Sequence, residues 1–172
     1  MRFLLVDRIL RMEPGKGAII RKNVSNSEDF FADHFAGRPI MPGCLILEAC
    51  DQAARLLLGS SVGFTRFPVL ERVVNGKFRH FVQPGDSLHV NVAVTSLEAA
   101  SAEIHANAFV EDRSVAQISL SYRLVDSTVD AKGASACART REFYEALTAD
   151  PVSIALESRA RATSQGGEAK DA

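Results

Sequence analysis

The feature that most constrains this chain is an unbroken apolar segment at residues 43–58, GCLILEACDQAARLLL. Pro42 stands directly before it, where a helix begins and a missing N–H costs nothing. Apolar side chains occur on nearly every side of the helical wheel rather than in one stripe, which is typical of a helix buried all round. We therefore predict a buried helix over residues 43–58, roughly 24 Å long, that ends at Gly59.

Glu48 is a carboxylate in the first two turns of this helix, next to the large aliphatic residues 45–47. An isolated buried charge is very costly, so Glu48 must be paired, hydrogen-bonded or protonated. Gln52 follows at i+4, on the same face, where it can supply a hydrogen bond. Apolar surroundings should also favour the protonated form of Glu48. Glu48 is therefore a candidate functional acid, and the alternative is a structural carboxylate paired with an arginine from elsewhere.

One histidine, His34, lies in the loop that leads to the helix. The residues 27–29 (Ser-Glu-Asp) predict a short helical turn ahead of it, and glycine and proline at residues 37–43 predict turns after it. At the start of the helix, near Gly43, unpaired backbone N–H groups and the helix dipole would suit a developing negative charge. The residues alone leave an alternative open for each position. His34 could be a packed structural histidine, and Gly43 could be required only by the turn.

A known family shares this pattern. The run His34-Phe-Ala-Gly-Arg-Pro-Ile-Met-Pro-Gly43, with Leu45-Ile-Leu-Glu48-Ala and Gln52, closely resembles the signature of the β-hydroxyacyl-acyl-carrier-protein dehydratases. The histidine and the acid of that family lie fourteen positions apart, as His34 and Glu48 do. The resemblance implies an α+β hotdog fold over residues 1–125, in which a curved antiparallel sheet wraps around a long central helix.

The resemblance also implies an activity, the dehydration of 3-hydroxyacyl-acyl-carrier-protein thioesters to trans-2-enoyl thioesters in fatty-acid or related lipid or polyketide synthesis. In this role His34 is the base, Glu48 acts on the hydroxyl group, Gln52 orients Glu48, and the backbone at Gly43 binds the thioester oxygen. A homodimer that joins His34 and Glu48 of opposite subunits is expected, with an acyl carrier protein as partner and with neither a metal nor a redox cofactor. Association beyond the dimer is left open.

Two departures from the family pattern indicate a divergent member. Ala36 stands where the family commonly has proline, and Asp51 stands where it commonly has a small residue; Asp51 is expected to pair with Arg55 at i+4. Glu48 is typical of the plain dehydratase branch, although residues 41–45 also resemble the dehydratase/isomerase branch. The alternative functions are a hotdog acyl thioesterase and a non-catalytic acyl-binding subunit of a hetero-oligomer.

The rest of the domain is predicted to form an antiparallel sheet. Alternating apolar residues predict strands at 88–94, 104–110 and 116–124, with one buried face. The dipeptide Asn75-Gly76 predicts a turn between two further strands, FPVLERVV and GKFRHFV. Residues 126–172 are predicted separately, as a linker around 132–135, a short amphipathic helix at 140–150 and a disordered tail at 163–172.

Composition narrows the class of protein. The chain has 172 residues, 47% of them hydrophobic and 24% charged, as expected of an ordinary globular domain. A net charge of −1 gives no electrostatic support for nucleic-acid binding. No segment predicts membrane insertion or a signal peptide, and we expect a cytoplasmic location in which three cysteines stay reduced and buried: Cys44, Cys50 and Cys137. Five basic residues are candidates for steering an acidic carrier protein or are scattered surface charge: Arg72, Lys77, Arg79, Arg113 and Arg123.

Overall fold

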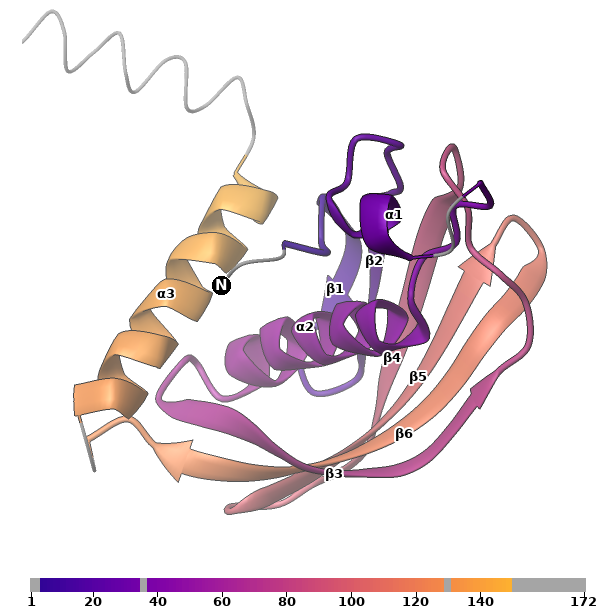
Figure 1. Cartoon of the computed structure of the whole chain (residues 1–172). Helices are drawn as coiled ribbons and strands as arrows, with labels where there is room; N and C mark the ends of the chain where they lie inside the picture. The colour runs from indigo at the N-terminus through magenta and orange to yellow at the C-terminus, as the bar shows by residue number, and fades with distance from the viewer. Residues whose placement is uncertain (1–3, 35–36, 129–130, 150–172) are drawn as a thin grey trace, which may run out of the picture.

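The fold is a curved antiparallel sheet wrapped around one long helix, α2 (Gly43–Ser61). The computed structural model describes residues 4–34, 37–128 and 131–149. Figure 1 shows α2 lying in the concave side of the six-stranded sheet, whose strand order is β1-β2-β4-β5-β6-β3. This is the arrangement that the family resemblance predicts, and it makes β1 and β3 the two edges of the sheet.

Every neighbouring pair of strands is antiparallel. The predicted alternation holds in the three central strands, where inward residues such as Val90, Ile104 and Ile118 are at most 1% exposed. These side chains pack on the helix, and burying each large one stabilises the fold by about 1.5–3 kcal/mol. The strands are β1 (Arg8–Glu13), β2 (Gly17–Asn23), β3 (Arg66–Phe78), β4 (Ser87–Leu97), β5 (Ser101–Val110) and β6 (Arg113–Asp126).

The strand β3 contradicts the turn predicted at Asn75-Gly76. It runs without interruption, and both residues pair with β6, opposite Ser119 and Ile118. Neither residue has the positive φ that an Asn-Gly hairpin turn requires. Instead, the register of β3 shifts twice, the second time between Val73 and Asn75, so the local sequence signal marks a bulge in a continuous strand.

The helix α2 begins at Gly43, as predicted, but continues past its predicted end at Gly59 to Ser61. A Cβ at residue 59 would lie only 2.9 Å from the Phe64 ring. Glycine is needed there for close packing, and the left-handed glycine lies farther on, at Gly63 (φ +60°). At the other end Cys44 is exposed, so the prediction that this thiol is buried was wrong.

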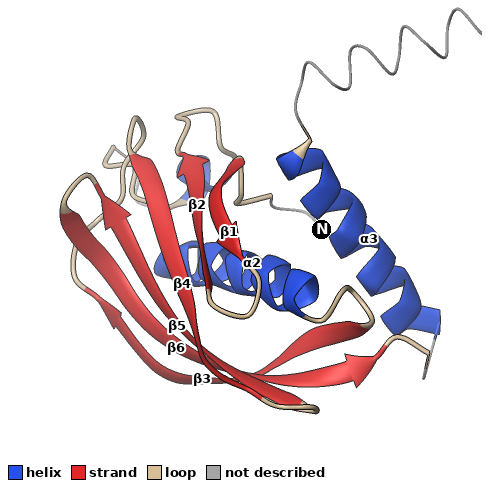
Figure 2. Ribbon diagram, turned by 180° about the vertical axis from the view of Figure 1, so that it is seen from behind, coloured by secondary structure: helices blue, strands red, loops and turns tan. Residues whose placement is uncertain are grey.

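Two further helices flank this core. The helix α1 (Phe30–Asp33) is the predicted short turn, although the side chain of Asp29 forms no capping hydrogen bond. The helix α3 (Ala131–Thr148) includes residues 132–135, which were expected to form a linker. Its partly buried residues, Phe143 among them, pack on the core because α3 lies across the C-terminal end of α2 (Figure 2).

The predicted tail at 163–172 lies outside the described residues, and the division of the chain at residue 125 stays a prediction. No described helix combines the length and the apolar character needed to span a membrane.

Candidate active site

His34 follows α1 directly and is half-buried. Its Nδ1 lies 2.7 Å from the carbonyl oxygen of Ile40. A carbonyl oxygen only accepts hydrogen bonds, so Nδ1 must carry the proton in the neutral ring. The lone pair of neutral His34 is therefore on Nε2, the nitrogen that a general base would use.

The start of α2 lies beside His34, in a cavity of about 280 Å³ that both His34 and Gly43 line. The first bond of the helix runs from the N–H of Leu45 to the carbonyl oxygen of Pro42 (2.9 Å), so the N–H groups of residues 43 and 44 precede the intrahelical ladder. These two groups and the positive end of the helix dipole provide a site for negative charge.

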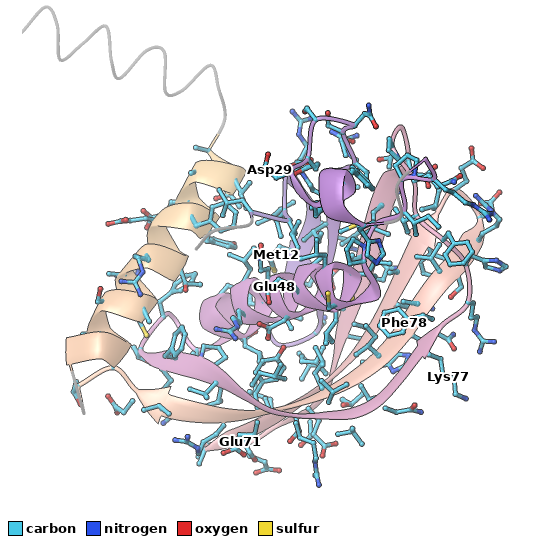
Figure 3. The ribbon with its side chains drawn as sticks, viewed as in Figure 1. Met12, Asp29, Glu48, Glu71, Lys77 and Phe78 are labelled. Atoms are coloured by element: carbon cyan, nitrogen blue, oxygen red, sulfur yellow. The ribbon has the colours of Figure 1, made fainter. Side chains whose placement is uncertain are left out.

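Neither backbone conformation nor packing requires glycine at position 43. Its φ lies outside the left-handed region, so the turn does not require glycine. A Cβ there would lie 3.5 Å from the ring of Phe78, which stands beside the N-terminal end of α2 in Figure 3. This is an ordinary van der Waals distance, so a small side chain would fit between the helix and the aromatic ring.

Glu48 is half-buried on α2 and accepts a hydrogen bond from Nε2 of Gln52 at 2.8 Å, as the i+4 spacing predicts. The Oε1 of Gln52 accepts the backbone N–H of Leu5 at 2.9 Å, so the N-terminal segment holds the amide in place. Among the described residues Glu48 forms no ion pair, which weighs against the alternative of a structural carboxylate held by an arginine.

A single protomer does not bring His34 and Glu48 into one cavity. Glu48 and Gln52 line a separate cavity of about 710 Å³, which extends along α2 toward α3. In Figure 3 Glu48 lies farther along α2 than Phe78, which lines the His34 cavity. The sequence-predicted residues thus form two groups, His34 with Gly43 and Glu48 with Gln52.

Asp51 forms a network that the sequence revealed only in part. Asp51 is 3% exposed, and its carboxylate accepts Nε of Arg55 at 2.7 Å, the expected i+4 pair. The other oxygen accepts the hydroxyl of Tyr122, also at 2.7 Å. Burial raises the pKa of the Asp51 carboxyl group, although Arg55 and Tyr122 act in the opposite direction.

The hydrogen bond of Tyr122 to Asp51 was not predicted from the sequence, although one signal indicated that Tyr122 needs a partner. It lies in the buried phase of the alternating strand at 116–124, and a buried tyrosine hydroxyl needs a hydrogen-bond partner. Burial and the neighbouring Asp51 raise the pKa of Tyr122, so its hydroxyl stays protonated and donates.

Comparison with known proteins agrees with the fold. Residues 1–119 match the family model described as a FabA-like domain, and the chain belongs to this family of hotdog proteins. Within the family it is similar to 3-hydroxyacyl-acyl-carrier-protein dehydratases named FabZ. The protein of Rickettsia rickettsii (strain Sheila Smith) is 37% identical over 128 residues, which are 73% of this chain and 88% of the relative.

The dehydratase FabZ of Symbiobacterium thermophilum is likewise 37% identical, over 126 residues that cover 73% of this chain and 89% of the relative. A protein of Streptococcus mutans, solved bound to acetyl-CoA, superposes with a TM-score of 0.60 at 16% identity, covering 73% of this chain and 94% of that one. At such low identity the superposition shows the shared fold alone. The helix α3, from Ala131 onward, lies outside the family match.

Proposed function

We propose that the protein is a 3-hydroxyacyl-acyl-carrier-protein dehydratase that serves fatty-acid or related lipid synthesis. The observation that carries this proposal is the geometry at the start of α2, where His34, whose Nδ1 is held by the carbonyl oxygen of Ile40, and Gly43, at the first turn of the helix, line one cavity. A base beside donors for an oxyanion is what removal of a proton next to a thioester carbonyl requires. The similarity to FabZ dehydratases supports the same reaction.

Each group has one task in the proposed mechanism. Nε2 of His34 takes the proton from the α-carbon, and the backbone N–H groups at Gly43 stabilise the negative charge on the thioester oxygen. The electron pair then forms the double bond as the bond from the β-carbon to the hydroxyl oxygen breaks. Glu48 gives a proton to that oxygen, which leaves as water. Loss of either proton-transfer group is expected to slow turnover by about 10²–10⁴-fold.

The proposed mechanism needs two protomers, because one protomer keeps His34 and Glu48 in different cavities. The edge strand β3 and the segment after it supply a surface for pairing with a second copy, since an unpaired edge is a template for another strand. Large apolar side chains are exposed there: Val73 (41%), Val74 (55%), Phe78 (50%) and Phe81 (61%). We infer a homodimer in which Glu48 of one protomer meets His34 of the other.

The carrier protein is proposed to dock at the rim of the His34 cavity. Of the five basic residues singled out in the sequence, Arg79 lines this cavity, together with His80. Arg38 lies nearby, with its guanidinium 5.7 Å from the centre of the Phe81 ring. By contrast, Arg123 is paired with Glu71 at 2.7 Å, far along β3. Positive charge at the rim would favour the approach of an acidic carrier.

The proposed location is the cytoplasm, where unpaired thiols such as Cys50 and Cys137 stay reduced.

The first test is hydration of a crotonyl thioester on acyl carrier protein, the reverse reaction, followed as loss of enoyl ultraviolet absorbance. We expect the wild type to add water and both His34→Ala and Glu48→Gln to lose this activity while keeping the dimer. Release of free thiol by the wild type would replace the proposal with the thioesterase alternative. Absence of both reactions across several chain lengths would favour the acyl-binding subunit.

A mixing experiment tests the shared site directly. After subunit exchange between the two inactive variants, we expect roughly a quarter of wild-type activity, because about half of the dimers are mixed and each mixed dimer has one intact site. If His34 and Glu48 of the same protomer worked together, the mixture would stay as inactive as its components.

A further inference from the structure

The helix α3 is held firmly over the C-terminal end of α2. The ring of Tyr144 packs on Phe64, with centroids 5.4 Å apart, and the guanidinium of Arg141 lies over the Phe64 ring, 5.5 Å from its centre. Arg141 also donates a hydrogen bond to the carbonyl oxygen of Gly63 at 3.1 Å. At Gly59 the absence of a side chain lets Phe64 and Thr140 approach the helix. The helix α3 is thus a fixed part of the domain.

The same helix forms one wall of the cavity that contains Glu48. The α2 side of this cavity is built by Glu48, Gln52, Arg55 and Leu56, which succeed one another at helical spacing on one face. From Glu48 to Leu56 the cavity follows α2 for about 12 Å. The wall at the far side comes from α3: Ala136, Arg139, Thr140, Glu142 and Phe143.

The cavity has the size and the surface of a ligand site. Its volume of about 710 Å³ lies within the range of small-molecule pockets, roughly 300–1,000 Å³. Phe67 and Leu56 give it apolar walls, while Arg55 stays bound to Asp51 with its guanidinium 5.7 Å from the centre of the Phe67 ring. An acyl chain whose β-carbon is placed at Glu48 would find apolar surface along α2 and would meet α3 at its far end.

We propose that α3 determines which acyl chains the enzyme accepts, by closing the far end of the cavity that begins at Glu48. This inference rests on the proposed dehydratase function, since it takes Glu48 to mark the position of the reacting hydroxyl group. The helix α3 follows the residues that match the family model. The proposed limit on acyl-chain length therefore comes from a segment outside the FabA-like domain.

The test compares two alanines of α3. Ala136 lines the cavity, whereas Ala138, two residues on, is exposed to solvent. We would measure kcat/KM for hydration of crotonyl, octenoyl, dodecenoyl and hexadecenoyl thioesters on the carrier protein. Relative to its effect on crotonyl turnover, Ala136→Phe should lower kcat/KM for the longest chain that the wild type accepts by about tenfold or more. Ala138→Phe should leave the whole profile unchanged.

A second variant works in the opposite direction. Phe143→Leu removes volume from the α3 wall and should raise the relative kcat/KM of the longest thioesters. Equal losses at every chain length in Ala136→Phe, or the same profile in the variants of residues 136 and 138, would overturn the inference. A wild type that hydrates none of these thioesters would instead overturn the dehydratase function, so the two failures are distinguishable.

Discussion

The carboxylates of Asp51 and Glu48 differ in where their hydrogen bonds come from. Glu48 is held by Gln52, one turn away on the same helix. Asp51 accepts the hydroxyl of Tyr122 from β6, so it connects the helix to the sheet as well as to Arg55. A buried carboxylate with two charged or strongly polar donors is expected to stabilise the fold, whereas Glu48 is only half-buried and keeps access to a cavity.

Removing the Tyr122 hydroxyl should destabilise the protein. In Tyr122→Phe, Asp51 loses one of its two donors while remaining buried, and we expect the free energy of unfolding to fall by about 1–3 kcal/mol. Chemical denaturation would measure this change. Tyr144→Phe is the matched control, because that tyrosine packs through its ring on Phe64 and should change stability by less than about 0.5 kcal/mol. Equal effects of the two variants would contradict the role of the buried hydrogen bond.

The residues of the candidate site could be predicted because their relations are local. Glu48 and Gln52 are four positions apart on one helix, and Gly43 marks the start of that helix. Tyr122, in contrast, lies 71 positions from Asp51, and only the folded sheet brings the two together. The spacing of His34 and Glu48 also does not predict that they line two different cavities. That depends on which side of α2 faces the His34 loop and which side faces α3.

At the scale of elements, local signals failed where tertiary contacts outweighed them. Asn75-Gly76 has strong turn propensity, yet pairing with β6 along its whole length keeps β3 extended. Gly59 is a common helix stop, yet α2 continues through it to Ser61, and the missing side chain leaves room for Phe64. The alternation in β4, β5 and β6 was predicted correctly because one face of each strand packs on the core and the pattern has a period of two.

Lys22 connects two elements and gives a pH-dependent prediction. The residue is 7% exposed, and its ammonium group pairs with Glu28, in the segment that leads to α1, at 2.7 Å, and with Asp7 at 3.4 Å. Burial on its own lowers the pKa of Lys22, but the two carboxylates outweigh it, so the pKa is raised above its ordinary 10.5. The stabilisation is therefore fully present below pH 10.5 and is lost as the pH rises through the folded-state pKa.

We expect Lys22→Met to cost about 1–3 kcal/mol at neutral pH, because two carboxylates lose their partner. The difference from the wild type should shrink as the pH rises above 10.5, where Lys22 itself loses its charge. Urea denaturation across this range would measure it. Lys16→Met, at an exposed position in the turn between β1 and β2, serves as the control and should show neither the cost nor the trend. A cost for Lys22→Met that is independent of pH would refute the ion-pair explanation.

At the scale of the whole molecule, the two edges of the sheet are expected to behave differently. Val74 is 55% exposed on the edge strand β3, and a charge there should oppose pairing with a second copy. We expect Val74→Glu to give a folded monomer without hydration activity, as judged by light scattering and circular dichroism. Leu10→Glu, at a residue 45% exposed on the opposite edge strand β1, should stay dimeric and active. A dimeric Val74→Glu variant, or a monomeric Leu10→Glu variant, would move the interface away from β3.

The place of α3 has a consequence for how a protein of this kind can diverge. Figure 1 shows α3 at the C-terminal end of α2, while α1 lies at the other end. The proposed pairing surface on β3, residues 73–78, lies in the half of the strand away from α3. Substitutions in α3 are therefore remote from His34, from the start of α2 and from the proposed dimer edge. Under the proposed function, the range of accepted acyl chains could change through this one helix while the His34 cavity and the pairing edge stay the same.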